Sequence, residues 1–366
     1  MAETEGNIST SFWDDIPSYH EYSDNFSEPD PRTVPCTQSE VGAFARFFCP
    51  AVFSLAFVVG LVGNGSVLVI LGKHRCPWLF ADCFLFQLAM ADLLLVLILP
   101  FRAAQFAQSW VFGEFLCKLL SALSTMNSYS TIFLMACLSV ERYLVIVRGI
   151  QLHHRWKLHH TYVASAGLWV LCFGLSVPEL HFHTVTYGHV AGASVCHLDF
   201  SAQGAGSWHL GLRFTSFSLG FLLPVLVMAF CYCQVVARLY QAHLFCKYSA
   251  LSLLLVILGL FVLCWAPFHG FLLVDSLQRL GHLDRDCARE KVLDFGLLFT
   301  ESLGMFHCCL NPLVYAVIGG KFRRELFRLF HWWDRSKEHD LRTCSQEHSQ
   351  ATENSTAQGL NYSVMI

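Results

Sequence analysis

The chain has 366 residues, of which 54% are hydrophobic and only 14% are charged, and its formal net charge is -3. A composition this apolar excludes an ordinary soluble domain, because such a domain would expose large apolar patches and usually carries about a quarter of charged residues. We therefore expect a polytopic membrane protein, in which the net charge says little because it averages the two sides of the membrane.

The amino-terminal residues 1–45 are polar and acidic, with eight Asp or Glu and only one basic residue, Arg32, before Pro35. Low hydrophobicity together with four prolines predicts a disordered tail. Two glycosylation sequons begin at Asn7 and Asn25, and they can be used only if this end of the chain lies outside the cell.

Seven apolar stretches follow, and each is long enough to cover the roughly 20 residues that a hydrocarbon core requires. The fold class predicted is an all-α membrane protein, with a seven-helix bundle over residues 46–319. The predicted spans are Phe47–Leu71, Phe84–Phe106, Phe115–Val140, Tyr162–Leu180, Leu210–Leu239, Ala250–Leu273 and Val292–Ile318.

The distribution of basic residues predicts the orientation of these spans. Lys and Arg gather after the first, third and seventh spans, so the positive-inside rule places those segments in the cytoplasm. The amino terminus is then extracellular, and we expect a multi-pass protein of the plasma membrane. The residues concerned are Lys73, Arg75, Arg148, Arg155, Lys157, Lys321, Arg323, Arg324 and Arg328.

Residues 320–333 carry apolar side chains at helical spacing opposite basic ones, which predicts a short amphipathic helix on the inner leaflet. The last segment, 334–366, is polar and rich in Ser and Thr. It is either a solvated tail or a platform for phosphorylation.

Each span also contains polar residues or prolines that an inert bundle would avoid. Asp92 is a carboxylate inside the second span and needs hydrogen-bonding partners or a cation. A helix–helix hydrogen bond is the ordinary explanation for any one of these residues. The set comprises Asn64, Asp92, Asn127, Arg142, Trp169, Pro224, Trp265, Pro267, Asn311, Pro312 and Tyr315.

Taken together, the order and spacing of these residues resemble the rhodopsin-like (class A) G-protein-coupled receptors over residues 45–332. The matching phrases are Gly63-Asn64, Leu88-Ala-Met-Ala-Asp92, Glu141-Arg142-Tyr143, Trp169, Phe261-Val-Leu-Cys-Trp265-Ala-Pro267 and Asn311-Pro312-Leu-Val-Tyr315.

This resemblance implies roles for the buried polar residues. Arg142 would be held by Glu141 in the inactive state and would turn toward Tyr232, Tyr315 and the G protein on activation. Trp265 would move above a packing relay of Ile132, Pro224 and Phe261. A sodium ion, the one cofactor expected, would be bound by Asp92, Asn127, Thr131 and Asn311. Lys247 departs from the family, since many relatives have an acid there.

Within this family, Trp110-Val-Phe-Gly113 before Cys117, and His307-Cys-Cys-Leu-Asn-Pro312, resemble the C-X-C chemokine receptors. That resemblance implies disulfides Cys117–Cys196 and Cys36–Cys287 and a basic chemokine as ligand. Tyr19 and Tyr22 lie among acidic residues and are candidates for sulfation, which would add negative charge to the tail. An acidic tail suits a basic ligand because opposite charge raises encounter rates. The implied ligand-binding residues are Tyr19, Tyr22, Arg102, Trp110, Asp199, Arg213, Asp275 and Glu301.

The ligand pocket departs from the family at two positions. Arg102 stands where relatives usually have Trp, and Ile98 stands where they usually have Thr. Arg102 would either pair with Glu301 across the pocket or meet an acid of the ligand.

Other functions fit the sequence less well than a receptor. No internal repeat indicates a transporter, and no His-Glu-x-x-His or Gly-x-Ser-x-Gly motif indicates an enzyme. A nucleotide receptor usually has a basic residue where Leu272 stands. The expectation is a non-enzymatic receptor in leukocyte chemotaxis, whose partners are chemokine, inhibitory-type G protein, arrestin and receptor kinases, with no nucleic acid. The alternative is a decoy that takes up chemokine without signalling.

Overall fold

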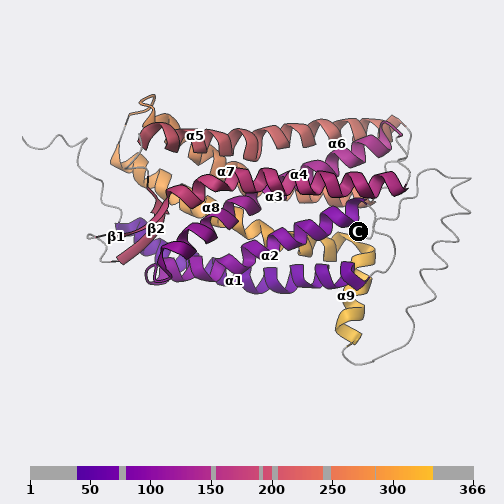
Figure 1. The fold of residues 1–366 in the computed structure, drawn as a ribbon, viewed down its shortest axis with the longest axis horizontal. Helices are drawn as coiled ribbons and strands as arrows, with labels where there is room; N and C mark the ends of the chain where they lie inside the picture. The colour runs from indigo at the N-terminus through magenta and orange to yellow at the C-terminus, as the bar shows by residue number, and fades with distance from the viewer. Residues whose placement is uncertain are drawn as a thin grey trace, which may run out of the picture. The chain divides into compact units, whose positions relative to one another are not determined.

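The structure is a computed structural model that describes residues 39–73, 80–149, 154–188, 193–199, 205–241, 249–284 and 286–332. Long helices dominate these residues (Figure 1). In chain order the elements are α1 Ser39–Lys73, α2 Phe80–Ala107, α3 Gly113–Ile146, α4 His154–Phe182, β1 His183–Gly188, β2 Ala193–Leu198, α5 Ala205–Phe217, the π-helical turn η1 Ser218–Leu222, α6 Leu223–Gln241, α7 Ser249–Arg279, α8 Cys287–Ile318 and α9 Gly320–Trp332.

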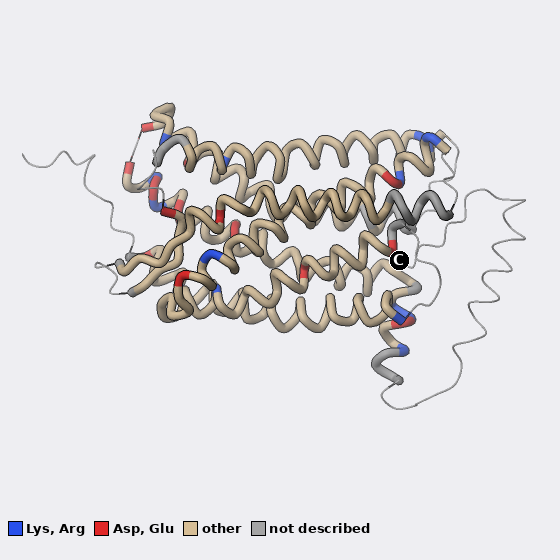
Figure 2. Tube along the Cα trace, viewed as in Figure 1, with Lys and Arg blue, Asp and Glu red and all other residues tan. Residues whose placement is uncertain are grey.

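The seven predicted spans are confirmed within the described residues, where seven helical segments are long and apolar enough to cross a membrane. The fifth of them is continuous through α5, η1 and α6. Most charged residues lie near the two ends of the helices, and the long middle sections are largely uncharged (Figure 2). This distribution is the one expected of helices whose middle sections meet lipid.

The first helix begins earlier than predicted. Its first residue, Ser39, lies inside the segment 1–45 that was assigned to the tail, so that boundary was wrong. Long-range contacts stabilise the additional turns, because Glu40 forms an ion pair with Lys291 of α8 and the ring of Phe44 packs against that of Phe295 of α8, with ring centroids 4.6 Å apart. Hydropathy alone did not reveal these turns because their partners lie some 250 residues away.

A π-helical turn interrupts the fifth span, and the sequence analysis did not predict it. The backbone N–H of Leu223 donates to the carbonyl of Ser218, five residues earlier. Pro224 follows at once, and proline has no N–H to donate and would crowd the carbonyl four residues before it. The wider turn relieves that conflict, as single π-turns within helices commonly do.

A two-stranded antiparallel sheet was not predicted from the sequence; in it β1 pairs with β2 and Val185 lies opposite Cys196. The predicted disulfide between Cys117 and Cys196 is present and attaches β2 to the first turns of α3. We call this end of the helices the sheet end, and the opposite end, where α9 follows α8, the α9 end (Figure 1).

Helix α3 is the centre of the packing, since it contacts α2, α4, α6 and both strands. The main core cluster includes Phe84, Ile132, Met228 and Phe261, all buried, from four different spans. Between α2 and α4, Gln87 accepts a hydrogen bond from Trp169 at 3.0 Å and donates one to Ser165 at 2.9 Å. These two partly buried hydrogen bonds join α2 to α4, as polar side chains commonly do between helices within a membrane.

The predicted amphipathic helix is confirmed as α9. Phe322 of α9 is buried and packs edge-on against Tyr315 of α8, with ring centroids 5.9 Å apart. Arg323, Arg324 and Arg328 are exposed. The arrangement gives α9 one apolar side toward the bundle and a basic side away from it.

Candidate functional site

At the sheet end, Arg102 of α2 and Glu301 of α8 form the ion pair that was one of the two predicted outcomes. Arg102 Nη1 lies 3.4 Å from Glu301 Oε1. Both side chains are partly exposed, at 28% and 38% respectively. A single long contact between partly solvated groups is weak, worth about 0–1 kcal/mol.

A second group of charges at the same end was not foreseen. Asp275 of α7 is buried and accepts hydrogen bonds from two guanidiniums, Arg213 of α5 and Arg279 one turn further along α7. The contact from Arg279 Nε is 3.0 Å long. Asp275 was predicted to bind ligand directly, but its carboxylate is already engaged by the chain's own arginines.

Trp110 was also predicted to contact ligand, and the structure places it differently. The residue is only 5% exposed, and its indole N–H donates to the carbonyl of Gly113 at 2.8 Å. Its backbone N–H donates to Ser194 of β2 at 2.7 Å. Trp110 therefore fixes the sheet onto the start of α3 and leaves almost no surface for a ligand.

The remaining predicted residues at this end are placed only in part. Asp199 follows β2 directly, and its backbone N–H donates to Phe182 at 2.9 Å. Cys287 is disulfide-bonded. Six predicted residues lie outside the described part of the chain: Asn7, Tyr19, Tyr22, Asn25, Cys36 and Lys247.

Midway along the helices, the structure brings the predicted polar residues together. Asn311 donates to Asp92 Oδ2 at 2.8 Å, and Asn127 donates to the carbonyl of Ala91 at 2.6 Å. Asp92 is fully buried. Four buried oxygens in this layer find no hydrogen-bond partner among the described residues: Asn64 Oδ1, Asp92 Oδ1, Asn127 Oδ1 and Thr131 Oγ1.

Such a set of one carboxylate and several neutral oxygens fits a hard monovalent cation. Hard cations take oxygen ligands, and a buried carboxylate without a compensating charge is costly. Asp92, Asn127 and Thr131 each contribute an oxygen with no partner in the described chain. Asn311 was predicted as a ligand too, but its amide nitrogen is directed at Asp92, so it orients the carboxylate.

Next to this layer, Trp265 of α7 contacts a residue to which the sequence analysis gave no role. Its indole N–H donates to Nδ1 of His307 on α8 at 3.3 Å, and both rings are buried. Gly304 lets the helices approach, because a Cβ there would lie 3.0 Å from the Trp265 ring. His307 and Asn311 are four residues apart, which places them on one helix face. This spacing is the feature of the sequence that could have indicated a role for His307.

Near the α9 end, the predicted pair of Arg142 and Glu141 is present. Arg142 Nε lies 3.3 Å from Glu141 Oε2, so the two side chains form an ion pair, but these two atoms do not form a hydrogen bond. Arg142 is only 8% exposed. Tyr143, the next residue, accepts a hydrogen bond from Arg148 at 3.1 Å.

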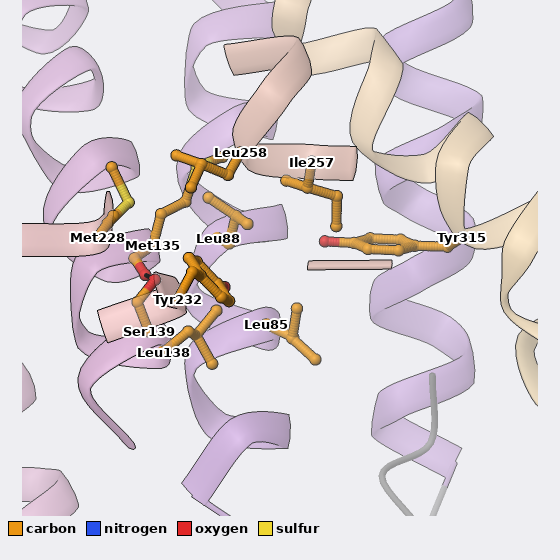
Figure 3. A pocket seen from close by; sticks show the side chains of 10 residues that line it. All are labelled: Leu85, Leu88, Met135, Leu138, Ser139, Met228, Tyr232, Ile257, Leu258 and Tyr315. Carbon is orange, nitrogen blue, oxygen red and sulfur yellow. Dashed lines mark hydrogen bonds between the residues drawn. The ribbon is translucent and has the colours of Figure 1, made fainter. Parts of the chain in front are cut away.

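A small cavity lies close to this pair, and residues of α2, α3, α6, α7 and α8 line it (Figure 3). Its volume of about 10 Å³ is close to the space that a single water requires. Tyr232 lines one side, and Tyr315 reaches in from the opposite side with its hydroxyl directed inward. That hydroxyl is buried and finds no hydrogen-bond partner among the described residues.

These features form three polar layers along the bundle: charged pairs at the sheet end, the Asp92 layer in the middle, and Arg142 with the two tyrosines near the α9 end. Trp265 and His307 lie between the charged pairs of the sheet end and the Asp92 layer. Buried groups with unused hydrogen-bonding capacity can exchange partners when helices shift, and packed interfaces of this kind have discrete alternative arrangements. The arrangement therefore suits transmission of a conformational change along the helices.

Comparisons with known proteins give a consistent result. Residues 63–315 match the model of the family described as "7 transmembrane receptor (rhodopsin family)". The chain is 39% identical to C-X-C chemokine receptor type 3 of Homo sapiens over 312 residues, which cover 85% of this chain and 84% of that receptor. It is 38% identical to C-X-C chemokine receptor type 5 of Homo sapiens over 327 residues, covering 88% and 87% of the two chains. It is 34% identical to C-X-C chemokine receptor type 4-B of Xenopus laevis over 296 residues, covering 81% and 82%.

Proposed function

The chain belongs to the rhodopsin-like seven-transmembrane receptors and, within them, to the chemokine receptors, a family of receptors and not of enzymes; we propose that it binds C-X-C chemokines at the sheet end and activates an inhibitory-type heterotrimeric G protein at the α9 end. The sheet end is then extracellular, in the plasma membrane, and the acidic tail captures the basic ligand by charge attraction. Receptor kinases and arrestin act on the Ser- and Thr-rich carboxyl-terminal tail, and the biological output is leukocyte chemotaxis.

The observation that best supports signalling is the arrangement of the buried side chains around Arg142. Arg142 is buried beside Glu141. Tyr232 and Tyr315 line the small cavity, which is also lined by residues of α3, the helix that contains Arg142. A guanidinium held by one weak contact can change partners once a helix moves, because the buried tyrosine hydroxyl offers an alternative acceptor. A decoy receptor does not need a buried arginine that can change partners.

A panel of purified C-X-C chemokines, applied to cells that express the full chain, tests the proposal. Ligand-dependent dissociation of an inhibitory-type G protein is measured beside chemokine uptake, and cells without the receptor are the control. We expect at least one chemokine to cause both responses. Uptake without G-protein dissociation would establish the decoy function instead.

We also propose that Na⁺ binds at the Asp92 layer and stabilises the inactive receptor by compensating the buried carboxylate. Asp92, Asn127 and Thr131 supply the oxygens, and Asn311 orients Asp92. A cation that binds only the folded state stabilises it by RT ln(1 + [Na⁺]/Kd), about 1.4 kcal/mol at ten times Kd.

Replacing choline chloride by NaCl at constant ionic strength should therefore raise the melting temperature of the purified receptor, and Asp92→Asn should remove this dependence. Glu114→Gln is the matched control, since it removes a carboxylate that pairs with Lys118 at the helix end. An equal Na⁺ effect in the Asp92→Asn receptor would exclude this site.

A further inference from the structure

Near the sheet end, α1 and α8 are joined by a regular series of side-chain contacts. Each contact joins a residue of α1 to the residue of α8 that lies 251 positions further along the chain. Successive contacts are four residues apart on both helices, so they lie one above another over about 12 Å. We call the six residues the α1–α8 ladder: Glu40 with Lys291, Phe44 with Phe295, and Phe48 with Phe299.

The α1–α8 ladder faces the membrane lipid. Phe295 and Phe299 are 41% and 43% exposed, and both helices are among the segments long and apolar enough to cross a membrane. The ion pair of Glu40 and Lys291 is the contact closest to the sheet end, because both helices begin there. A molecule that lies along the ladder therefore meets a polar pair near the membrane surface and four aromatic rings below it.

The aromatic rings of the ladder hold one another in place. Phe44 packs against Phe295 with ring centroids 4.6 Å apart, and Phe48 stacks on Phe299 at 5.5 Å. Phe44 also stacks on Phe48, with ring centroids 4.7 Å apart and an angle of 20° between the ring planes. Such ring pairs are favourable beyond the area that they bury. The surface is thus ordered before a ligand arrives, and binding costs little side-chain entropy.

We propose that the α1–α8 ladder is a binding site for a sterol in the leaflet at the sheet end. The fused rings of the sterol lie on the phenylalanines, and its hydroxyl group donates a hydrogen bond to Glu40. A carboxylate accepts about four hydrogen bonds, so Glu40 can accept this one while it remains paired with Lys291. The ligand class is a rigid, uncharged amphiphile with one hydroxyl group, and the inference goes beyond the proposed function.

Charge and rigidity favour a sterol over a phospholipid at this surface. The Glu40–Lys291 pair carries no net charge. A phosphate group would compete with Glu40 for the ammonium group of Lys291, whereas a hydroxyl group adds to the existing pair. An acyl chain loses the freedom of many bonds when it is held on an ordered surface, but a fused ring system has almost none to lose.

Photo-cross-linking to the full-length receptor in phosphatidylcholine nanodiscs tests the location of the site. The probe is cholesterol with a diazirine in its ring system, and labelled peptides are identified by mass spectrometry. We expect labels within residues 40–48 and 291–299, and an excess of cholesterol should remove them. Mirror-image cholesterol orders the bilayer in the same way but fits the ladder poorly. It should compete at least about fivefold less well, the loss expected for one misplaced aromatic contact.

A competitor without the hydroxyl proton tests the polar contact and leaves the protein unchanged. Cholesteryl methyl ether keeps the fused rings but cannot donate a hydrogen bond to Glu40. It should therefore displace the probe less well than cholesterol does. Equal displacement by the two would show that the Glu40–Lys291 pair takes no part in binding, contrary to the proposal.

A double variant tests the aromatic surface. Phe295→Leu combined with Phe299→Leu keeps the surface apolar but removes two rings, so labelling should fall at least about fivefold and lose its preference for natural cholesterol. The matched control is Phe47→Leu. Phe47 is 79% exposed on α1, but it precedes Phe48 by one residue and so lies about 100° around the helix from it. Its replacement should leave labelling unchanged.

Three results would overturn the inference: equal competition by the two mirror-image forms, labels confined to other helices, or unchanged labelling in a folded double variant. Labelling of the ladder by a photoactivatable phosphatidylcholine that cholesterol does not displace would assign the surface to bulk phospholipid, and would overturn it too. The competition experiments use the unaltered receptor, so they decide the matter even if the double variant does not fold. They require no chemokine response, so a failure of the proposed function would leave their outcome unaffected.

Discussion

Replacing Arg142 by Ala should abolish ligand-dependent G-protein dissociation while chemokine binding and surface expression remain close to normal. Arg142 is buried at the α9 end, and Glu141 is its ion-pair partner at 3.3 Å. A central arginine in an interface is commonly worth at least about 2 kcal/mol, which corresponds to a loss of roughly thirtyfold or more in coupling. The proposed ligand-binding residues lie at the opposite end of the helices, so the substitution removes no contact that the proposal assigns to ligand.

The measurement is G-protein dissociation over a range of chemokine concentrations, beside binding of labelled chemokine to the same cells. Arg328→Ala is the matched control, because this arginine is exposed and its ion pair among the described residues is with Glu325 of the same helix, at 2.5 Å. A normal G-protein response in the Arg142→Ala receptor would show that output does not pass through this layer.

Replacing Cys117 or Cys196 by Ser should remove most surface-expressed, ligand-binding receptor. The disulfide joins residues that are 79 positions apart. Closing a loop of that size stabilises a fold by about 2–5 kcal/mol. Without it, β2 keeps only weaker contacts with the helices, such as the hydrogen bonds of Ser194 with Trp110 and of Cys196 with Gln105. The sheet would then lose its fixed position above the Arg102–Glu301 pair.

Surface expression, chemokine binding and the melting temperature of the purified variant check this expectation. Cys233→Ser serves as the control, since Cys233 is free and exposed on α6. Peptide mapping under non-reducing conditions should show Cys117 and Cys196 in one cross-linked fragment. A free Cys117 thiol in folded receptor that binds ligand would contradict the assignment.

The sequence by itself determined the number and type of the membrane-spanning elements. Each span is a local property, because about 20 consecutive apolar residues must bury their backbone polar groups in helical hydrogen bonds. The amphipathic pattern of α9 is equally local and was predicted to within one residue of its end. The spaced phrases around Asp92, Arg142 and Asn311 pointed correctly to the family, because they are read directly from residue order.

Only the tertiary structure decided how the charged and polar side chains are paired. Arg213 engages Asp275 across 62 positions, and Trp110 is buried and donates its backbone N–H to Ser194 of β2. Neither Asp275 nor Trp110 is therefore the free ligand contact that the family resemblance implied. The role of His307 beside Trp265 likewise depends on contact between α7 and α8.

The physical reason is that a side chain's chemistry is set by its partners, and partners that lie on different helices leave no periodic pattern in the sequence. The π-turn before Pro224 and the early start of α1 have the same origin, since each is a local geometry selected by packing. The choice between the two predicted partners of Arg102 was settled for the free receptor in the same way, by the 3.4 Å contact that brings α2 and α8 together at Glu301.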